Sequence, residues 1–527
     1  MLIDSRDLAG GTELRADVCI VGSGPAGATI ALELEGSGLD VLVLEAGGLD
    51  VEPEQQDLYE AEMTGEVFGS RDEPVPVSQT RLRTLGGTSQ HWSGFCRPLR
   101  PVDLEPRPEL GRPGWPISYD ELSQHYERAA EILQLGPARF DHGYWSDAAD
   151  IGPVLVDDDV VETVVFQISD VRFGSTYRPA LDAARDVRVI THMSVTGIVP
   201  DESGRTVDRL EVATVGGKRF TVRARRLVIA TGGIETPRLL LASAPGRGGV
   251  GNDSDEVGRG FCEHGQGRIA IGVLSRTPEE MTAYNLPAVA APAGRVSGDD
   301  LRLQAALLLS DETVRKEGIM GVEAQLLTVA RTEAEPEILA GIGLGDVTDL
   351  VPTVDGTGTM ASFLVIGEQA RHPESRITLG DAVDGLGMPR PRLHWVVSDD
   401  DRRSYVRGVE LMAQRLGAAG VGRMQLVAGA VCPNPEGEGF LGRMAIDAEA
   451  IDPTDFPLLQ ANHHCCTVPM SADPSSGVVD RDLKVWGFED LHLAGSGVFP
   501  TAGVTSPTIS IVALSVRLAQ HLQGELS

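Results

Sequence analysis

The sequence predicts an α/β protein with two domains, or with a discontinuous pair of domains. It has 527 residues, whereas single hydrophobic cores stop growing at about 250 to 300 residues. A β-branched run at 17–21 is followed by a glycine turn and a helix-like segment at 28–35, and residues 227–233 begin a second unit of this kind. Strand, glycine turn and helix in this order are typical of α/β proteins with helix-covered sheets.

The composition is that of a folded globular chain. Hydrophobic residues make up 42% and charged residues 23% of it, and no low-complexity tract interrupts it, which excludes wholesale disorder. The net charge of -32 argues against nucleic acid or an anionic membrane as a partner, because both would be repelled. The longest apolar runs are far shorter than the roughly 20 residues that span a bilayer, so no transmembrane segment is expected.

The six cysteines indicate a reduced, cytoplasmic protein without a cysteine metal site. None of them has the CxxC spacing of zinc or iron–sulfur ligands, and no leader segment precedes the first predicted strand. The neighbours Cys465 and Cys466 are expected to stay reduced. No metal ligand is predicted from the sequence.

The N-terminal segment has the pattern of a dinucleotide site. Gly22, Gly24 and Gly27 have GxGxxG spacing between a predicted strand and a predicted helix. The first glycine can adopt the turn's backbone angles, the second lets a pyrophosphate approach the helix N-terminus, and the third lets the helix pack closely on the sheet. Glu45 lies 18 residues after Gly27, where a ribose-binding acid belongs. The second glycine turn, at 227–233, favours FAD over NAD.

Four further segments carry a resemblance to a known family. They read RTLGGTSQHW at 83–92, GVVD at 477–480, LHLAGSGVFPT at 491–501 and SPT at 506–508. Together with the glycine motif they closely resemble the glucose-methanol-choline (GMC) oxidoreductases, and most of all the bacterial branch similar to pyranose oxidase and sugar or aminoglycoside alcohol oxidases. The resemblance implies a two-domain flavoenzyme that moves a hydride from an alcohol carbon to flavin N5 while a histidine takes the hydroxyl proton.

The resemblance also points to the catalytic residues. The family's base lies in an H-x-x-G-T-x-x-M stretch, which here reads HHCCTVPM from His463 onward, and imidazole titrates in the range that a base near neutral pH needs. Because neighbouring side chains of a strand point to opposite faces, His463 and His464 should not both confront the flavin. Ser506 stands where the family usually has His or Asn, and a hydroxyl cannot act there as a second base. Cys466 replaces the motif's glycine.

The resemblance also bears on the roles of two other histidines. His91 has the S-x-H-W context in which some relatives bind the flavin covalently, whereas in others FAD is simply held, and the sequence leaves both possibilities open. His264 lies in a segment whose histidine is usually structural. The expected cofactor-binding residues are Gly22, Gly24, Pro25, Ala26, Gly27, Glu45, Ala46, Gly86, Gly87, Thr88, Ser89, His91, Trp92, Ser93, Val195, Ala230, Thr231, Gly232, Gly495, Ser496, Pro507 and Thr508.

The resemblance and the hydrophobic patterns together predict how the domains divide. We expect a discontinuous Rossmann-like FAD-binding domain and a substrate-binding domain with an antiparallel sheet, flanking helices and a lid. Helices are predicted at 120–133, 301–313, 315–330 and 399–416, and strands at 376–379 and 392–397. The FAD-binding domain is assigned to 1–100, 187–266 and 460–527, and the substrate-binding domain and lid to 101–186 and 267–459.

The function expected from the resemblance is FAD-dependent oxidation of a hydroxyl on a sugar, aminosugar, glycoside or related natural product. The partners would be a small-molecule alcohol, cationic in one version of the hypothesis, and oxygen or another electron acceptor. Two alternatives stay open, a non-redox lyase and a catalytically silent flavoprotein. The substrate's identity and the oligomeric state are not predicted.

Overall fold

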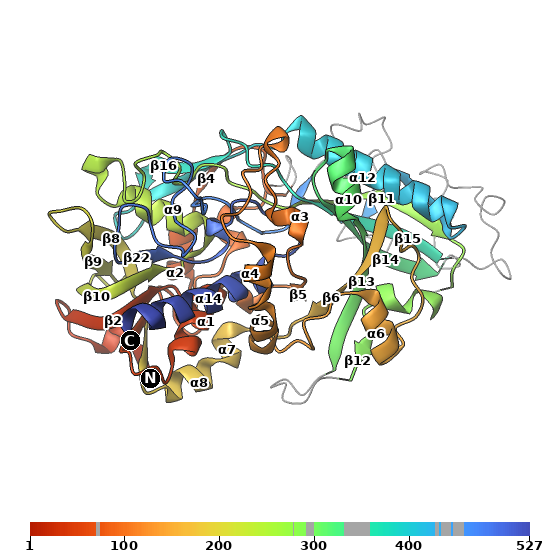
Figure 1. Ribbon diagram of the computed structural model, residues 1–527. Helices are drawn as coiled ribbons and strands as arrows, with labels where there is room; N and C mark the ends of the chain where they lie inside the picture. The colour runs from red at the N-terminus through yellow and green to blue at the C-terminus, as the bar shows by residue number, and fades with distance from the viewer. Residues whose placement is uncertain are drawn as a thin grey trace.

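Two large β-sheets form the core of the protein. The computed structural model describes residues 1–69, 74–277, 279–290, 300–330, 359–426, 432–433, 444–445 and 458–527. In this part of the chain one sheet has eight strands and the other nine, and they lie toward opposite ends of the molecule with helices around them (Figure 1). This mixture of sheets and packed helices confirms the predicted α/β class.

The first sheet is mainly parallel. It contains β1 (Leu2–Asp4), β2 (Glu13–Val21), β3 (Val41–Leu44), β7 (Val187–Thr191), β8 (Ser194–Pro200), β9 (Val207–Ala213), β10 (Arg219–Ile229) and β22 (Leu491–Leu493). The order is β1-β7-β3-β2-β10-β9-β8, and β22 pairs with β10. Among these described strands the antiparallel pairs are those of β9 with β10 and of β9 with β8. The carboxyl ends of β2, β3 and β10 therefore meet at one edge, where open α/β sheets bind ligands.

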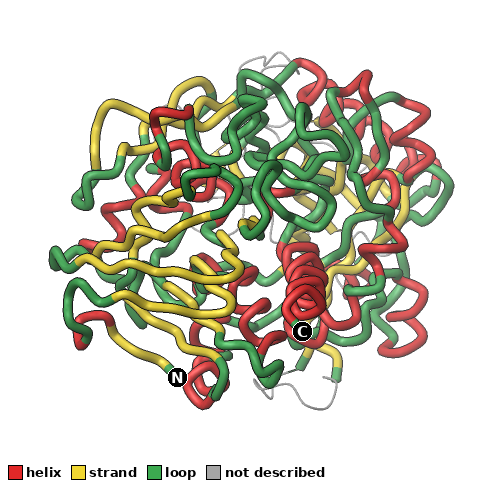
Figure 2. The backbone as a smooth tube through the Cα atoms, turned by 60° about the vertical axis from the view of Figure 1, so that its left-hand side comes forward, coloured by secondary structure: helices red, strands yellow, loops and turns green. Residues whose placement is uncertain are grey.

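Two helices pack side by side next to this sheet. They are α1 (Pro25–Leu34), which contacts β2 and β3, and the C-terminal α14 (Thr508–Leu526), as Figures 1 and 2 show. Proline suits the first position of α1 because that position needs no N–H donor. No described helix, α14 included, combines the length and the apolar character that crossing a bilayer requires.

The second sheet is antiparallel throughout its described pairs. Its strands are β5 (Phe95–Cys96), β6 (Val161–Ile168), β11 (Gly265–Leu274), β12 (Ala288–Val289), β13 (Leu301–Leu309), β14 (Val322–Ala330), β15 (Thr359–Gly367), β18 (Gly422–Leu426) and β21 (Leu459–Gln460). Helix α12 (Asp399–Ala418) packs on β14, β15 and β18. Its first turn is capped by Ser398, and the predicted helix at 399–416 is confirmed.

Two of the predicted helices are wrong. Segments 301–313 and 315–330 are mostly strand, because β13 and β14 pair with each other in the second sheet, and only α10 (Asp311–Glu317) is helical. Residues 303–309 are all buried, so this strand has apolar residues on both faces and lacks the alternation that marks a half-buried strand. The Leu- and Ala-rich composition then favours a helix, which strand pairing overrides.

The described fold also contains a helical pair, a small third sheet and, after β10, helix α9 (Gly232–Ala242). The segment predicted as one helix at 120–133 forms α4 (Tyr119–Ser123) and α5 (Tyr126–Ile132), and Ser118 caps the first of them. The third sheet contains β4 (Glu62–Gly65), β16 (Arg376–Val383) and β17 (Pro389–Trp395), which bears out the two predicted strands in this region. Because β4 pairs with β17, segments assigned to different domains share one sheet. The domain division stays a prediction.

Candidate active site

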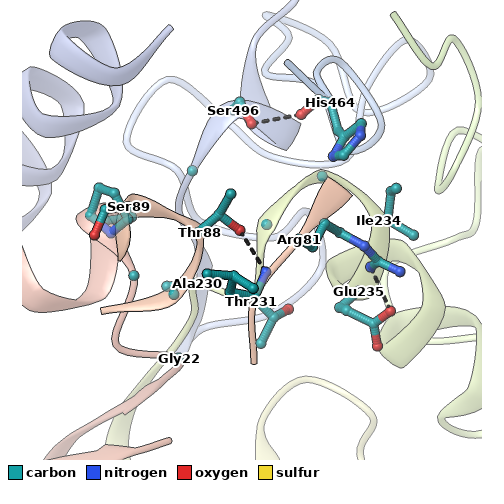
Figure 3. A pocket seen from close by; sticks show the side chains of 18 of the residues that line it. Gly22, Arg81, Thr88, Ser89, Ala230, Thr231, Ile234, Glu235, His464 and Ser496 are labelled. Carbon is teal, nitrogen blue, oxygen red and sulfur yellow. Dashed lines mark hydrogen bonds and ion pairs between the residues drawn. The ribbon is translucent and has the colours of Figure 1, made fainter. Parts of the chain in front are cut away.

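A cavity of about 630 Å³ opens at the carboxyl ends of β2, β3 and β10. His463, Ser506 and all but two of the predicted cofactor-binding residues line it, although they come from segments far apart in the chain. Figure 3 shows several of these side chains around the space. The two exceptions, Gly27 and Gly86, lie behind the wall of the cavity. The structure thus brings together residues that the sequence placed in separate motifs.

The glycine turn after β2 explains why one predicted glycine lies outside the cavity. A Cβ on Gly27 would stand 1.9 Å from the carbonyl oxygen of Gly22, so this residue permits close packing. A Cβ on Gly24 would meet no protein atom within 4 Å, and this residue caps α1 without a side-chain hydrogen bond. The first turn of α1 therefore faces open space with its N–H groups available to an anion.

Glu45 supports the same turn from the end of β3. Its Oε2 accepts hydrogen bonds from the backbone N and the Oγ of Ser23, at 3.0 and 2.5 Å, and its Oε1 accepts one from Gly47 N at 2.8 Å. Burial raises the pKa of this carboxyl. Glu45 lines the cavity, but the structure also gives it a local task, which is to join the turns that follow β2 and β3.

The segment 83–92 forms the part of the cavity wall beside the glycine turn. Gly87 approaches Gly24 so closely that a Cβ on it would lie 3.3 Å from the Cα of Gly24. The Oγ1 of Thr88 accepts a hydrogen bond from Leu82 N at 3.2 Å, and Trp92 Nε1 donates one to the carbonyl oxygen of Val171 at 2.8 Å. His91 lines the cavity with an exposed side chain. Both hypotheses for His91 stay predictions.

A buried group of charges, which no sequence motif marked, forms another part of the wall. Arg81 Nη1 donates to Glu235 at 2.8 Å (Figure 3), and Arg238 donates to the same carboxylate at 3.0 Å. Although burial opposes ionisation, Arg238 and Arg81 lower the pKa of Glu235 to about 2. The Nε atoms of Arg81 and Arg83 are buried without a hydrogen-bond partner. Arg83 begins the motif at 83–92, but no sequence signal would have identified Arg81, Glu235 and Arg238, because their spacing has no pattern.

The ring of His463 is held by a second histidine. Its Nδ1 lies 2.8 Å from Nδ1 of His264, whose Nε2 lies 2.6 Å from the carbonyl oxygen of Gly503. A carbonyl only accepts, so the neutral His264 carries its proton on Nε2 and accepts at Nδ1; burial lowers its pKa to about 4. His463 must then donate from Nδ1, which leaves the unshared electron pair on its Nε2. Sequence reasoning had treated His264 as structural only and missed this contact.

Glu263 fixes the backbone around both rings. Its Oε1 accepts hydrogen bonds from the backbone N of His463 at 2.7 Å and of His264 at 2.8 Å. The side chain is completely buried, and burial raises its pKa to about 8. Burial, followed by the neighbouring His264 and His464, lowers the pKa of His463 well below its usual 6.5. The cavity side of this region is therefore neutral at physiological pH.

The adjacent His464 has a different environment. Its ring stacks on Phe68 and Phe261 and is 8% exposed, and its carbonyl oxygen accepts a hydrogen bond from Ser496 Oγ at 2.7 Å (Figure 3). Burial lowers its pKa to about 3. Both histidines contribute to the cavity wall, but only His464 is packed between aromatic rings. Cys466 has φ 68, a left-handed conformation that explains the glycine of the family pattern.

The residues that line the cavity fit a dinucleotide. Added Cβ atoms would meet nothing within 4 Å at Gly24, Gly232 and Gly495, so three backbone segments are open to a ligand. The unpartnered guanidinium nitrogens of Arg81 and Arg83 add buried donors beside this space, and helix N-termini and arginines both favour phosphate groups.

Comparisons with known proteins agree with this fit. Family models described as GMC oxidoreductase match residues 172–266 and 371–515, and one described as FAD binding domain matches 15–59. The chain is 26% identical to C-glycoside 3-oxidase from Microbacterium trichothecenolyticum over 97% of both chains. It is 24% identical to paromamine 6'-oxidase from Streptomyces fradiae, over 97% of this chain and 92% of that one. A crystal structure of formate oxidase superposes with a TM-score of 0.57 at 16% identity, covering 98% and 99% of the two chains, which shows a shared fold.

Proposed function

The chain belongs to the GMC oxidoreductase family, binds FAD and acts as an oxidase or dehydrogenase of alcohols, and from this premise we propose that it oxidises a hydroxyl of a sugar, aminosugar or glycoside with His463 as the base. The observation that carries this proposal is the unshared electron pair on Nε2 of His463, a residue of the cavity wall. FAD, when bound, accepts the hydride that leaves the substrate carbon.

The cofactor would be held by the segments that line the cavity with open backbone. The N-terminus of α1 at Gly24 suits the diphosphate, and Glu45 and Val195 lie where the adenosine part is expected. The flavin would then extend toward Gly495 and Pro507. These placements follow the roles that the sequence resemblance implies for each motif, and they are our proposal for each residue.

The proton step follows from the hydrogen bonds of His463. An alcohol releases hydride more readily as its O–H proton is removed, so the base must be neutral before the reaction. The low pKa of His463 keeps it neutral, and the Nδ1 of His264 accepts its other N–H and holds the ring in one orientation. After the proton moves to Nε2, the imidazolium still donates from Nδ1 to the neutral His264, so the ring keeps its orientation.

Ser506 and the surface charge bear on the substrate class. Ser506 lines the same cavity as His463, and we propose that its hydroxyl orients the substrate oxygen, with one hydrogen bond to give or accept. Relatives named C-glycoside 3-oxidase and paromamine 6'-oxidase support a glycoside or aminoglycoside. The net charge of -32 would draw a cationic substrate toward the protein.

The test is anaerobic reduction of the flavin by a panel of neutral sugars, glycosides and aminoglycosides. We expect at least one of them to bleach the yellow FAD band, and His463→Ala to slow the bleaching by about 10²- to 10⁴-fold without loss of FAD. His142→Ala, on the surface helix α6 (His142–Ala149), is the control and should match the wild type. An undiminished rate in His463→Ala rejects this residue as the base, and turnover that leaves the flavin oxidised would indicate the lyase alternative.

A further inference from the structure

A second cluster of ionisable side chains lies away from the cavity. It consists of His492 on β22 and of His521 and Glu525 on α14, and their ligand atoms all lie within 4.8 Å of one another. Both elements begin or continue at the cavity, because Thr508 starts α14 and Gly495 follows β22. His521 lies 13 residues along α14, which is about 20 Å from its first residue, and Figure 2 marks the C-terminus with which α14 ends.

His492 is a buried histidine whose ring nitrogens make no hydrogen bond to the described residues. The residue is 0% exposed. Buried polar atoms in folded proteins normally have a hydrogen-bond partner, and an imidazole nitrogen is a common metal ligand. The neighbouring His521 Nε2 is likewise buried and without a hydrogen bond.

Glu525 presents one oxygen to the histidines and the other to an arginine. Arg226, on β10, donates from Nε to Oε2 at 2.8 Å, which leaves Oε1 at 3.4 Å from His521 Nε2. Two ligands held at about 2.0–2.1 Å from one zinc ion in a tetrahedron are about 3.3–3.4 Å apart. This separation is too long for a strong hydrogen bond and suits two ligands of one metal. Arg226 would orient the carboxylate from outside, as such supporting groups do at metal sites.

We propose that His492, His521 and Glu525 bind one divalent transition-metal ion, with Zn²⁺ the best match. Two imidazoles and one carboxylate are donors that zinc accepts, whereas Mg²⁺ and Ca²⁺ prefer oxygen alone. The side chains of His521 and Glu525 are 30% and 26% exposed, so a metal can enter and water can complete the coordination. The ion would link the last turns of α14 to β22. It would thus hold together two elements whose other ends lead to the cavity.

Zinc binding to the FAD-loaded enzyme tests this proposal directly. After treatment with EDTA and dialysis, calorimetric titration with zinc sulfate should show one site per chain, and zinc should raise the melting temperature, because it binds only the folded site. His521→Ala and Glu525→Gln each remove a partly exposed ligand, and each should weaken binding at least tenfold. His372→Ala, which changes a histidine outside the cluster, is the matched control and should bind as the wild type does.

Each outcome of this experiment supports or overturns the site. Circular dichroism and the FAD spectrum establish that each variant is folded. If the folded wild type takes up no zinc, or if His521→Ala and Glu525→Gln bind it as tightly as His372→Ala does, the proposal is wrong. The second result would assign the binding to the acidic surface instead. The readout does not depend on substrate turnover, so it is independent of the function proposed for the cavity.

Discussion

The two large sheets contribute to the active site in different ways. The parallel sheet ends in turns whose glycines leave open space for the cofactor, so its contribution is made by backbone. The antiparallel sheet ends in buried polar side chains that reach toward His463. The first kind of site depends on close packing of local segments, and the second on contacts between segments distant in the sequence.

A chain of contacts links the antiparallel sheet to the base. Glu368, directly after β15, is 0% exposed and accepts a hydrogen bond from Gly503 N at 3.2 Å. The carbonyl oxygen of Gly503 accepts from His264 at 2.6 Å, and His264 in turn accepts from His463. Arg112, also buried, pairs with Glu368 at 3.1 Å. The orientation of the base thus depends on a buried ion pair that lies outside the cavity wall.

The largest effect is expected at the glycine turn of the parallel sheet. Gly27→Ala places a Cβ at 1.9 Å from Gly22 O, so the turn and α1 cannot keep their packing, and we expect little folded, FAD-containing protein. Gly24→Ala adds a Cβ in open space and should fold normally but bind FAD more weakly, because the methyl group occupies the cofactor's side of the turn. Thermal melting and FAD content distinguish the two variants, and equal behaviour would contradict the division of roles.

The second-largest effect is expected at the buried ion pair of the antiparallel side. Glu368→Ala leaves Arg112 as a buried charge without its partner, which costs about 3–5 kcal/mol. Urea unfolding measures this loss. The exposed pair between Arg128 and Glu131 is the control, and Glu131→Ala should cost less than about 1 kcal/mol. Similar losses in both variants would mean that Arg112 finds other partners.

The difference between the two sheets also explains how much of the site could be predicted. The cofactor side is encoded locally: strand, glycines, helix and acid follow one another within about thirty residues, so the sequence alone predicts that Gly22, Gly24 and Glu45 lie at one site, and all three line the cavity. The partners of His463 are far from it in sequence, since His264 precedes it by 199 residues and Glu263 by 200. Only the folded antiparallel sheet brings them together.

The same reason accounts for the incorrect helices. Strand β13 lies inside the second sheet, between β14 and β6, and is buried on both faces, so its sequence lacks the period that distinguishes a strand from a helix. The parallel β3 is also buried on both faces, but the glycine turn and helix around it identify it as a strand. The neighbouring motif therefore identifies a buried strand in the parallel sheet, whereas hydrophobic periodicity alone could not identify one in the antiparallel sheet.

A smaller effect, on activity alone, is expected at His264. His264→Leu removes the acceptor for Nδ1–H of His463, and we expect flavin reduction by the best alcohol to slow about 10- to 100-fold while FAD content stays unchanged. His264→Asn can place an amide oxygen near the same position and should recover part of the rate. If leucine and asparagine behave alike in stopped-flow measurements, the contact with His463 has no role in orienting the base.

The effect that is smallest at low pH, and that grows as the pH rises, is expected from the charge on Glu263. Burial raises its pKa in the folded protein to about 8, above the ordinary value of 4.5, so the protonated form is favoured by folding. Its contribution to stability is complete below pH 4.5 and is lost as the pH rises toward 8, with a slope of up to about 1.4 kcal/mol per pH unit. Glu263→Gln is neutral throughout and can still accept from the backbone N–H of His463. Urea unfolding at several pH values should therefore show that the free energy of unfolding of the variant rises relative to that of the wild type between pH 4.5 and 8. A constant difference would mean that the surroundings of Glu263 stabilise its charge, so that this residue is already ionised at low pH.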